Sequence, residues 1–192
     1  MSASEVEIKF YVHDIEQLTH SLKNAGFTLQ TPRTHEMNTL YDTPSQTLRR
    51  RGELIRIRKY GDTWTVTHKG KGSTSGRHKS RIETETTVAD GAKLAIILEA
   101  AGLQASFRYE KYRSEWTDGK GHVVIDETPI GNFGEIEGRA RWIDRTARQL
   151  KIRSEDYITD TYAGLFLQWK KRTQSAAQEM TFAAIPHQRR AS

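Results

Sequence analysis

The sequence predicts an α+β fold in which about eight antiparallel strands are flanked by helices. Segments that alternate polar with apolar residues dominate from residue 34 onward, and turn residues such as Gly61-Asp62 separate neighbouring segments. Three later stretches with helical spacing interrupt the series. A barrel is one arrangement of such strands that buries a complete face of the sheet. The chain of 192 residues is long enough for one core, and we expect a single domain over residues 1–171.

A change of period marks the first strand and the first helix. Residues 5–12 alternate charged with apolar side chains, which is the period of a strand. Apolar residues then recur at helical spacing from Ile15 to Ala25, behind Asp14 as a suitable N-cap. Gly26 stands where a helix would end.

The remaining elements follow the same two patterns. Further helices are predicted at residues 91–101, 139–150 and 156–169. Residues 69–80 are rich in Gly, Ser and Lys and predict a loop, and residues 172–192 have the composition of a flexible tail. Further strands are predicted at residues 37–41, 53–60, 64–69, 81–88, 105–116, 122–126 and 134–138.

Composition excludes several classes of protein. The chain has no cysteine, so it has neither a disulfide framework nor a thiolate metal site. The first residues lack the apolar run of a signal peptide, and no later segment approaches membrane-spanning length, so we expect a cytoplasmic protein with no membrane partner. The formal charge of +6 favours anionic partners without saying which kind.

Three predicted strands carry two glutamates at positions i and i+2, so that both carboxylates lie on one face. At a separation of ~6–7 Å such a pair repels by roughly 2–3 kcal/mol at an effective dielectric near ~20. A bound metal or facing cations would remove this cost. The three pairs are Glu5 and Glu7, Glu83 and Glu85, and Glu135 and Glu137.

Cations occur in the same register as these carboxylates, while the opposite strand faces are apolar. Lys9 follows Glu7 by two residues, and Arg81 precedes Glu83 by two. An ordinary sheet with a solvated charged face would also alternate in this way, but it has no need of glutamate pairs on one strand after another. We therefore expect the charged faces to point inward. The other cations spaced in this way are Arg56 and Arg58, and Lys111 and Arg113.

The order of these motifs resembles that of the CYTH superfamily, the triphosphate tunnel metalloenzymes. The segment EVEIK at residues 5–9 is similar to the family's E-x-E-x-K signature, and the resemblance extends from residue 5 to about residue 165. The other matching segments are TLYDTPSQTLRRRGELIRIRKY at 39–60, WTVTHKG at 64–70, RIETE at 81–85, KYRSEW at 111–116 and VVIDETPIGNFGEIEG at 123–138.

The resemblance implies an eight-stranded antiparallel tunnel in which acidic residues hold Mg²⁺ or Mn²⁺ and basic residues bind a triphosphate. Oxygen ligands suit a hard divalent cation, and the planar fork of arginine suits phosphate. By this resemblance the metal ligands are Glu5, Glu7, Asp126, Glu135 and Glu137, with Glu83 and Glu85 as second-rank ligands. The phosphate contacts are Lys9, Arg56, Arg58, Lys69 and Arg113, with Arg81 and Lys111 as additions.

The same resemblance places Lys9, Glu5 and Glu7 at the catalytic centre. The metal and the cations would neutralise charge on the transferred phosphoryl group while a water molecule attacks the terminal phosphorus. A lysine base needs a lowered pKa, whereas Glu5 and Glu7 would raise the pKa of Lys9, so we interpret Lys9 as a phosphate contact. The chain departs from members that pair this lysine with a tyrosine early in the second strand, because the nearest residues here are Leu40 and Tyr41.

Other features receive structural interpretations. The seven histidines lack the spacing of a metal site and are interpreted as structural or surface residues. The run Arg49 to Arg51 is interpreted as solvated, and nucleic-acid binding is not expected. The helix at residues 156–169 either closes one mouth of the tunnel or packs as an ordinary surface helix.

The sequence thus predicts hydrolysis of the terminal phosphate of a small molecule, either inorganic triphosphate or an organic triphosphate such as thiamine triphosphate. One alternative is a class IV adenylate cyclase, which would use the same tunnel on ATP. The other is a binding module that holds polyphosphate or nucleic acid without turnover. The organic group of the substrate, the choice between Mg²⁺ and Mn²⁺ and the formation of a homodimer are left open.

Overall fold

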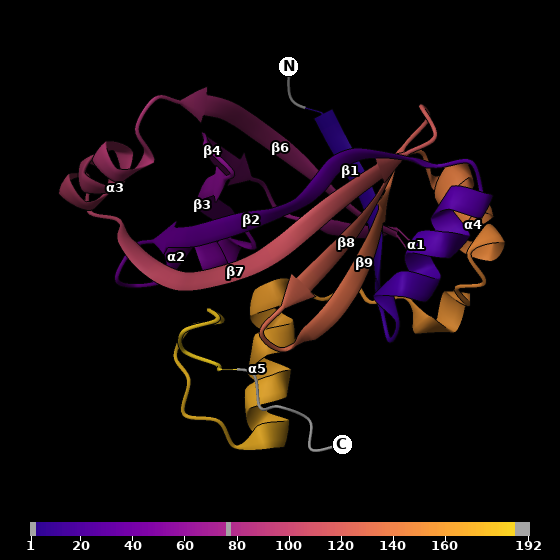
Figure 1. Ribbon diagram of the computed structural model, residues 1–192. Coiled ribbons are helices and arrows are strands. Elements are labelled where there is room, and N and C mark those ends of the chain that lie inside the picture. The colour runs from indigo at the N-terminus through magenta and orange to yellow at the C-terminus, as the bar shows by residue number, and fades with distance from the viewer. Residues whose placement is uncertain (1–2, 76–77, 187–192) are drawn as a thin grey trace.

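A ring of paired antiparallel strands forms the body of the protein (Figure 1). The computed structural model describes the backbone of residues 3–75 and 78–186 and the side chains of residues 6–72 and 82–186. The strands are β1 (Ala3–Tyr11), β2 (Thr28–Asp42), β3 (Leu54–Tyr60), β4 (Thr63–Lys69), β5 (Ser73–Ser75), β6 (His78–Val88), β7 (Gln104–Thr117), β8 (His122–Thr128) and β9 (Gly131–Glu137).

The order of the strands shows how the ring closes. The sheet has nine strands, of which the short β5 extends one edge of β6. The other eight run in the order β1-β9-β8-β7-β2-β3-β4-β6, and β1 pairs with β6 as well as with β9. Every pairing is antiparallel. The predicted eight-stranded antiparallel barrel with flanking helices is therefore confirmed.

Helices lie around this ring (Figure 1). The helix α1 (Ile15–Asn24) begins after Asp14, whose side chain accepts a hydrogen bond from the backbone N–H of Gln17 (2.9 Å), and the chain leaves the helix through Gly26 at a φ of +85°. Within the described part of the chain, no helix combines the length and the apolar character needed to span a membrane. The helices are α1 (Ile15–Asn24), α2 (Thr47–Arg51), α3 (Gly91–Ala100), α4 (Ala140–Gln149), the 3-10 helix η1 (Ser154–Asp156) and α5 (Tyr162–Thr173).

The apolar faces of β1, β8 and β9 point outward and pack against α1 and α4. Ile8, Val123 and Ile136 from the strands meet Leu22 and Ile143 from the helices, and all five are almost fully buried. Each such side chain contributes about 1.5–3 kcal/mol on burial. Because the core occupies this face, the charged face of the same strands must point into the ring. The alternative of a solvated charged face is wrong for these strands.

The C-terminal segment is packed, which corrects one prediction. Met180 is fully buried and exchanges backbone hydrogen bonds with β7, from its N–H to the carbonyl oxygen of Arg108 (3.0 Å) and from the N–H of Glu110 to its carbonyl oxygen (2.9 Å). Met180 and Ile185 belong to a second core cluster with residues of α5, among them Phe166. The flexible tail predicted from residue 172 therefore does not describe residues 172–186.

Element boundaries differ from the prediction mainly before α5. The helix was expected from residue 156, but residues 157–161 are not helical, and the N–H of Ile158 donates to the carbonyl oxygen of Lys9 (2.7 Å). The helix begins after Thr161, whose hydroxyl accepts from the N–H of Gly164 (3.1 Å). The short elements α2 and β5 were not predicted, and β2 begins several residues earlier than expected, at Thr28.

Candidate active site

A cavity of about 430 Å³ lies inside the ring of strands. Alternation of side chains along each strand directs the charged faces into this space, because the opposite faces are taken by the core. The start of helix α5 forms part of the cavity wall, through Tyr162, Ala163 and the preceding residue Thr161. Among the predicted site residues, those that line the cavity are Glu7, Lys9, Arg56, Arg58, Lys69, Glu83, Glu85, Lys111, Arg113, Glu135 and Glu137.

Strand pairing brings three carboxylates from β1 and β9 together. Glu7 lies opposite Glu137 and Lys9 lies opposite Glu135 in the register of these two strands. One oxygen from each of Glu7, Glu135 and Glu137 lies within 4.8 Å of the others. A set of three carboxylates matches the preference of hard divalent cations such as Mg²⁺ and Mn²⁺ for oxygen ligands. The residues present therefore fit a metal, and these three would hold it.

Glu135 also binds two of the predicted phosphate contacts. The Lys9 ammonium donates to one of its oxygens and the Arg113 guanidinium donates to the other. Burial alone would raise the pKa of Glu135, but Lys9 and Arg113 hold it well below its ordinary value. Burial would likewise lower the pKa of Lys9, but the carboxylates of Glu135 and Glu7 raise it above its ordinary value. Lys9 is therefore protonated at neutral pH.

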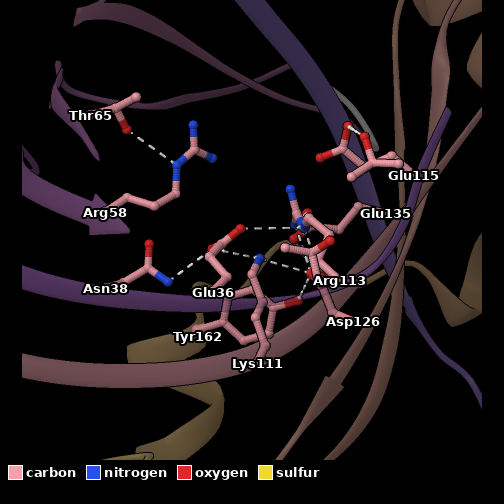
Figure 2. Close-up of polar contacts among 12 residues, drawn as sticks. Glu36, Asn38, Arg58, Thr65, Lys111, Arg113, Glu115, Asp126, Glu135 and Tyr162 are labelled. Atoms are coloured by element: carbon pink, nitrogen blue, oxygen red, sulfur yellow. Dashed lines mark hydrogen bonds and ion pairs between the residues drawn. The ribbon is translucent and has the colours of Figure 1, made fainter. Parts of the chain in front are cut away.

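Asp126 lies outside this carboxylate cluster. It is fully buried and is not part of the cavity wall. Lys111 donates to it at 3.0 Å, Arg113 donates two hydrogen bonds of 2.7 Å in a fork, and the Tyr162 hydroxyl donates at 2.6 Å (Figure 2). Asp126 thus holds the two cations in position and is not one of the three carboxylates of the cluster, and its predicted role as a metal ligand stays a prediction.

Glu36 is a buried carboxylate that the sequence analysis missed. It is fully buried on β2, within 3.4 Å of the Lys111 ammonium and 3.8 Å of the Arg113 guanidinium, and it accepts a hydrogen bond of 2.8 Å from Asn38 (Figure 2). Burial alone would raise its pKa, but Lys111 and Arg113 lower it to about 2. The sequence did carry one signal for Glu36, because Glu36 and Asn38 are polar residues two positions apart in β2 and therefore share one face of the strand.

The middle acidic pair faces cations on the neighbouring strands. Glu85 accepts from Arg58 at 3.0 and 3.2 Å and from Arg56 at 3.4 Å, and Glu83 forms an ion pair with Lys69. Of the two roles considered for Glu83 and Glu85, these contacts match the orientation of cations, since neither belongs to the carboxylate cluster found among the described residues.

Two predicted residues lie where the structure describes the backbone alone. Glu5 of β1 and Arg81 of β6 are partners in the pairing of these strands. Their side chains lie outside the described residues, so their predicted contacts with metal and phosphate stay predictions.

Comparison with known proteins identifies the family. The sequence model of the CYTH domain matches residues 3–162, which is most of the chain. The chain belongs to the CYTH domain family. No curated protein matches the CYTH domain described here at a significant level.

Solved structures share the fold of this CYTH domain. A proposed adenylate cyclase from Vibrio parahaemolyticus is 21% identical, with a TM-score of 0.75 over 87% of this chain and 99% of the other. A proposed adenylyl cyclase from Hippeastrum, whose structure is described as revealing a dominant triphosphatase activity, is 17% identical, with a TM-score of 0.62 over 85% and 95% of the two chains. A proposed adenylate cyclase from Bacillus halodurans is 18% identical, with a TM-score of 0.63 over 84% and 96%. At these identities the similarity shows the fold alone.

The cavity of the CYTH domain combines cations with a cluster of carboxylates, an arrangement that suits an anionic ligand bound together with a metal. The cations of the cavity come from strands on opposite sides of the ring, with Arg56, Arg58 and Lys69 on β3 and β4 and with Lys9, Lys111 and Arg113 on β1 and β7. The carboxylate cluster lies beside the second group. Phosphate oxygens between the two groups would meet positive charge on both sides, and one end of the ligand would meet the metal ligands.

Proposed function

We propose that this protein hydrolyses the terminal phosphate of inorganic triphosphate or of a small organic triphosphate, with Mg²⁺ or Mn²⁺ as cofactor. The observation that carries the proposal is that one cavity holds both a cluster of three carboxylates and two groups of cations. A site that only bound a polyanion would have no use for Glu7 and Glu137, which reduce its positive charge.

The cations of the cavity would bind the triphosphate and neutralise its charge. Arg56 and Arg58 present guanidinium groups that can bind phosphate oxygens in a fork, and Lys69 and Lys111 present ammonium groups. In the free protein these cations are held by carboxylates, so their side chains are already oriented toward the cavity. Prior orientation lowers the entropic cost of binding the substrate and its transition state.

Lys9 would act as a phosphate contact. Its ammonium group lies in the cavity wall beside Glu135, where it can donate to a phosphate oxygen. A metal held by Glu7, Glu135 and Glu137 would supply a Lewis acid for the phosphate oxygens. Arg113, which contacts both Asp126 and Glu135, would stabilise the negative charge that develops during phosphoryl transfer.

The test is phosphate release from inorganic triphosphate, thiamine triphosphate and ATP with Mg²⁺, Mn²⁺ or EDTA. We expect metal-dependent release, reduced on the order of 100-fold by Glu137→Gln, since loss of a metal ligand costs at least as much as loss of its supporting residues. Glu16→Gln, at an exposed position on α1, is the matched control and should retain full activity. Release that persists in EDTA, or in Glu137→Gln, would contradict the proposal.

A cyclase activity is the second candidate, because all three of the similar structures named above are of proposed adenylate or adenylyl cyclases. The same assay separates the two reactions. With ATP, a cyclase produces cyclic AMP and pyrophosphate without releasing orthophosphate, whereas the proposed hydrolase releases orthophosphate and no cyclic nucleotide.

A further inference from the structure

Tyr162 connects the C-terminal helix to the charged residues of the cavity. It is the first residue of α5, is 8% exposed and forms part of the cavity wall. Its hydroxyl donates a hydrogen bond of 2.6 Å to Asp126, the buried carboxylate that also accepts from Lys111 and Arg113 (Figure 2). The hydroxyl, which is the one polar group of the Tyr162 side chain, thus contacts the Asp126 carboxylate that holds Lys111 and Arg113 in position.

The ring of Tyr162 faces two ammonium groups at once. The Nζ atom of Lys9 lies 4.5 Å from the ring centroid and that of Lys111 lies 4.9 Å from it. Both distances are within the ~6 Å at which a cation is attracted to an aromatic face. Lys9 comes from β1 and Lys111 from β7, so one ring contacts cations from two separate strands.

The ring is itself held in place by other aromatic residues. Tyr109 stacks on it at 5.7 Å with an interplanar angle of 26°, and Phe133 meets it edge-on at 5.7 Å. Burial and the nearby anions Asp126 and Glu135 hold the pKa of Tyr162 well above its ordinary value, so the hydroxyl remains a donor. An aromatic ring held by two other rings is a rigid support for the two ammonium groups.

We propose that Tyr162 is a positioning residue: its ring holds the ammonium groups of Lys9 and Lys111 toward the cavity, and its hydroxyl fixes Asp126 beneath them. The inference rests on the proposed function, since the two lysines are taken to bind the triphosphate. It gives α5 a role beyond packing, because the side chain that begins the helix completes the phosphate site.

The test is calorimetric binding of inorganic triphosphate in the presence of EDTA, which measures the phosphate site without requiring hydrolysis. We expect Tyr162→Leu to weaken binding by about tenfold, because both cation–π contacts are lost. Tyr162→Phe keeps the ring and should weaken binding by less than about threefold, because Lys111 and Arg113 still hold Asp126. Where wild type hydrolyses, the same variants should raise KM more than they lower kcat.

Two further variants separate positioning from helix packing. Phe166→Leu removes a buried ring from the same helix, one that packs on Phe107 at 5.4 Å and does not line the cavity. It should lower the melting temperature and leave triphosphate affinity unchanged. Pentafluorophenylalanine at position 162 keeps an aromatic ring in place but removes the negative electrostatic potential of the ring face. This variant should therefore bind triphosphate more weakly than the Tyr162→Phe variant does.

The outcomes distinguish this inference from the proposed function. Equal affinities for the fluorinated and unfluorinated rings would overturn the role of the ring, and so would a Phe166→Leu variant that binds as weakly as Tyr162→Leu. Wild-type protein that binds triphosphate, loses affinity in the expected order and yet releases no phosphate would uphold Tyr162 as a positioning residue and refute the hydrolase.

Discussion

Replacing Glu36 with glutamine should destabilise the protein in a way that depends on pH. The carboxylate is fully buried, and the cations Lys111 and Arg113 lower its pKa from 4.5 to about 2. This difference in pKa corresponds to ~3 kcal/mol of stability at neutral pH, at about 1.36 kcal/mol for each tenfold change in proton affinity. For a chain of this size, Glu36→Gln should then lower the melting temperature by roughly 6–12 °C. The measurement is urea denaturation at pH 7, followed by circular dichroism.

The sign of the pH dependence follows from the lowered pKa of Glu36. Its contribution is complete above the unfolded-state value of 4.5 and is lost as the pH falls toward about 2. The difference in unfolding free energy between wild type and Glu36→Gln should therefore be ~3 kcal/mol at pH 7 and less than about half of that at pH 3. Taking the difference removes the titration of other carboxylates, and exposed Glu16→Gln serves as the control. A difference that is the same at both pH values would refute the electrostatic reasoning.

Three other perturbations test separate parts of the structure. Glu137→Gln should reduce Mn²⁺ affinity by about tenfold or more in calorimetric titration, with little change in melting temperature, because the side chain is a cavity ligand and not part of the core. Arg58→Lys should raise KM for inorganic triphosphate several-fold in steady-state assays, because an ammonium cannot bind two phosphate oxygens in a fork. Met180→Ala should cost about 2–5 kcal/mol in urea denaturation, as expected for a fully buried side chain, whereas a flexible tail would show no cost.

The strands of the barrel were predictable because each has one apolar face that is buried and one face that carries charged side chains. The alternation survives in the sequence wherever a strand packs against helices, as β1 does with Ile8 and Phe10 outward and Lys9 inward. The closed ring came from the family resemblance, since alternation carries no information about which strand pairs with β1. That pairing is decided by contacts far apart in the chain, such as Ile8 with Ile136 in the buried core.

The parts that the sequence did not predict depend on tertiary contacts. Met180 and Ile185 are isolated apolar residues in a polar segment, so no local pattern indicates that they are buried. Glu36 has no second glutamate two positions away, so it did not stand out as the paired glutamates did. Tyr162 lies on a helix with many aromatic residues, and only the fold directs it at Asp126.

The partner strands of the acidic cluster have a consequence for synthesis of the chain. Lys9 and Glu135 are 126 positions apart, so β1 has left the ribosome long before its partner β9 exists. During that interval one edge of β1 has unpaired backbone groups, which makes the nascent chain a target for chaperones or for aggregation. A nascent chain that ends before Glu137 lacks one of the three carboxylates of the cluster, so it cannot form the complete metal site. High-affinity metal binding by stalled chains of increasing length would therefore report the moment at which the barrel closes.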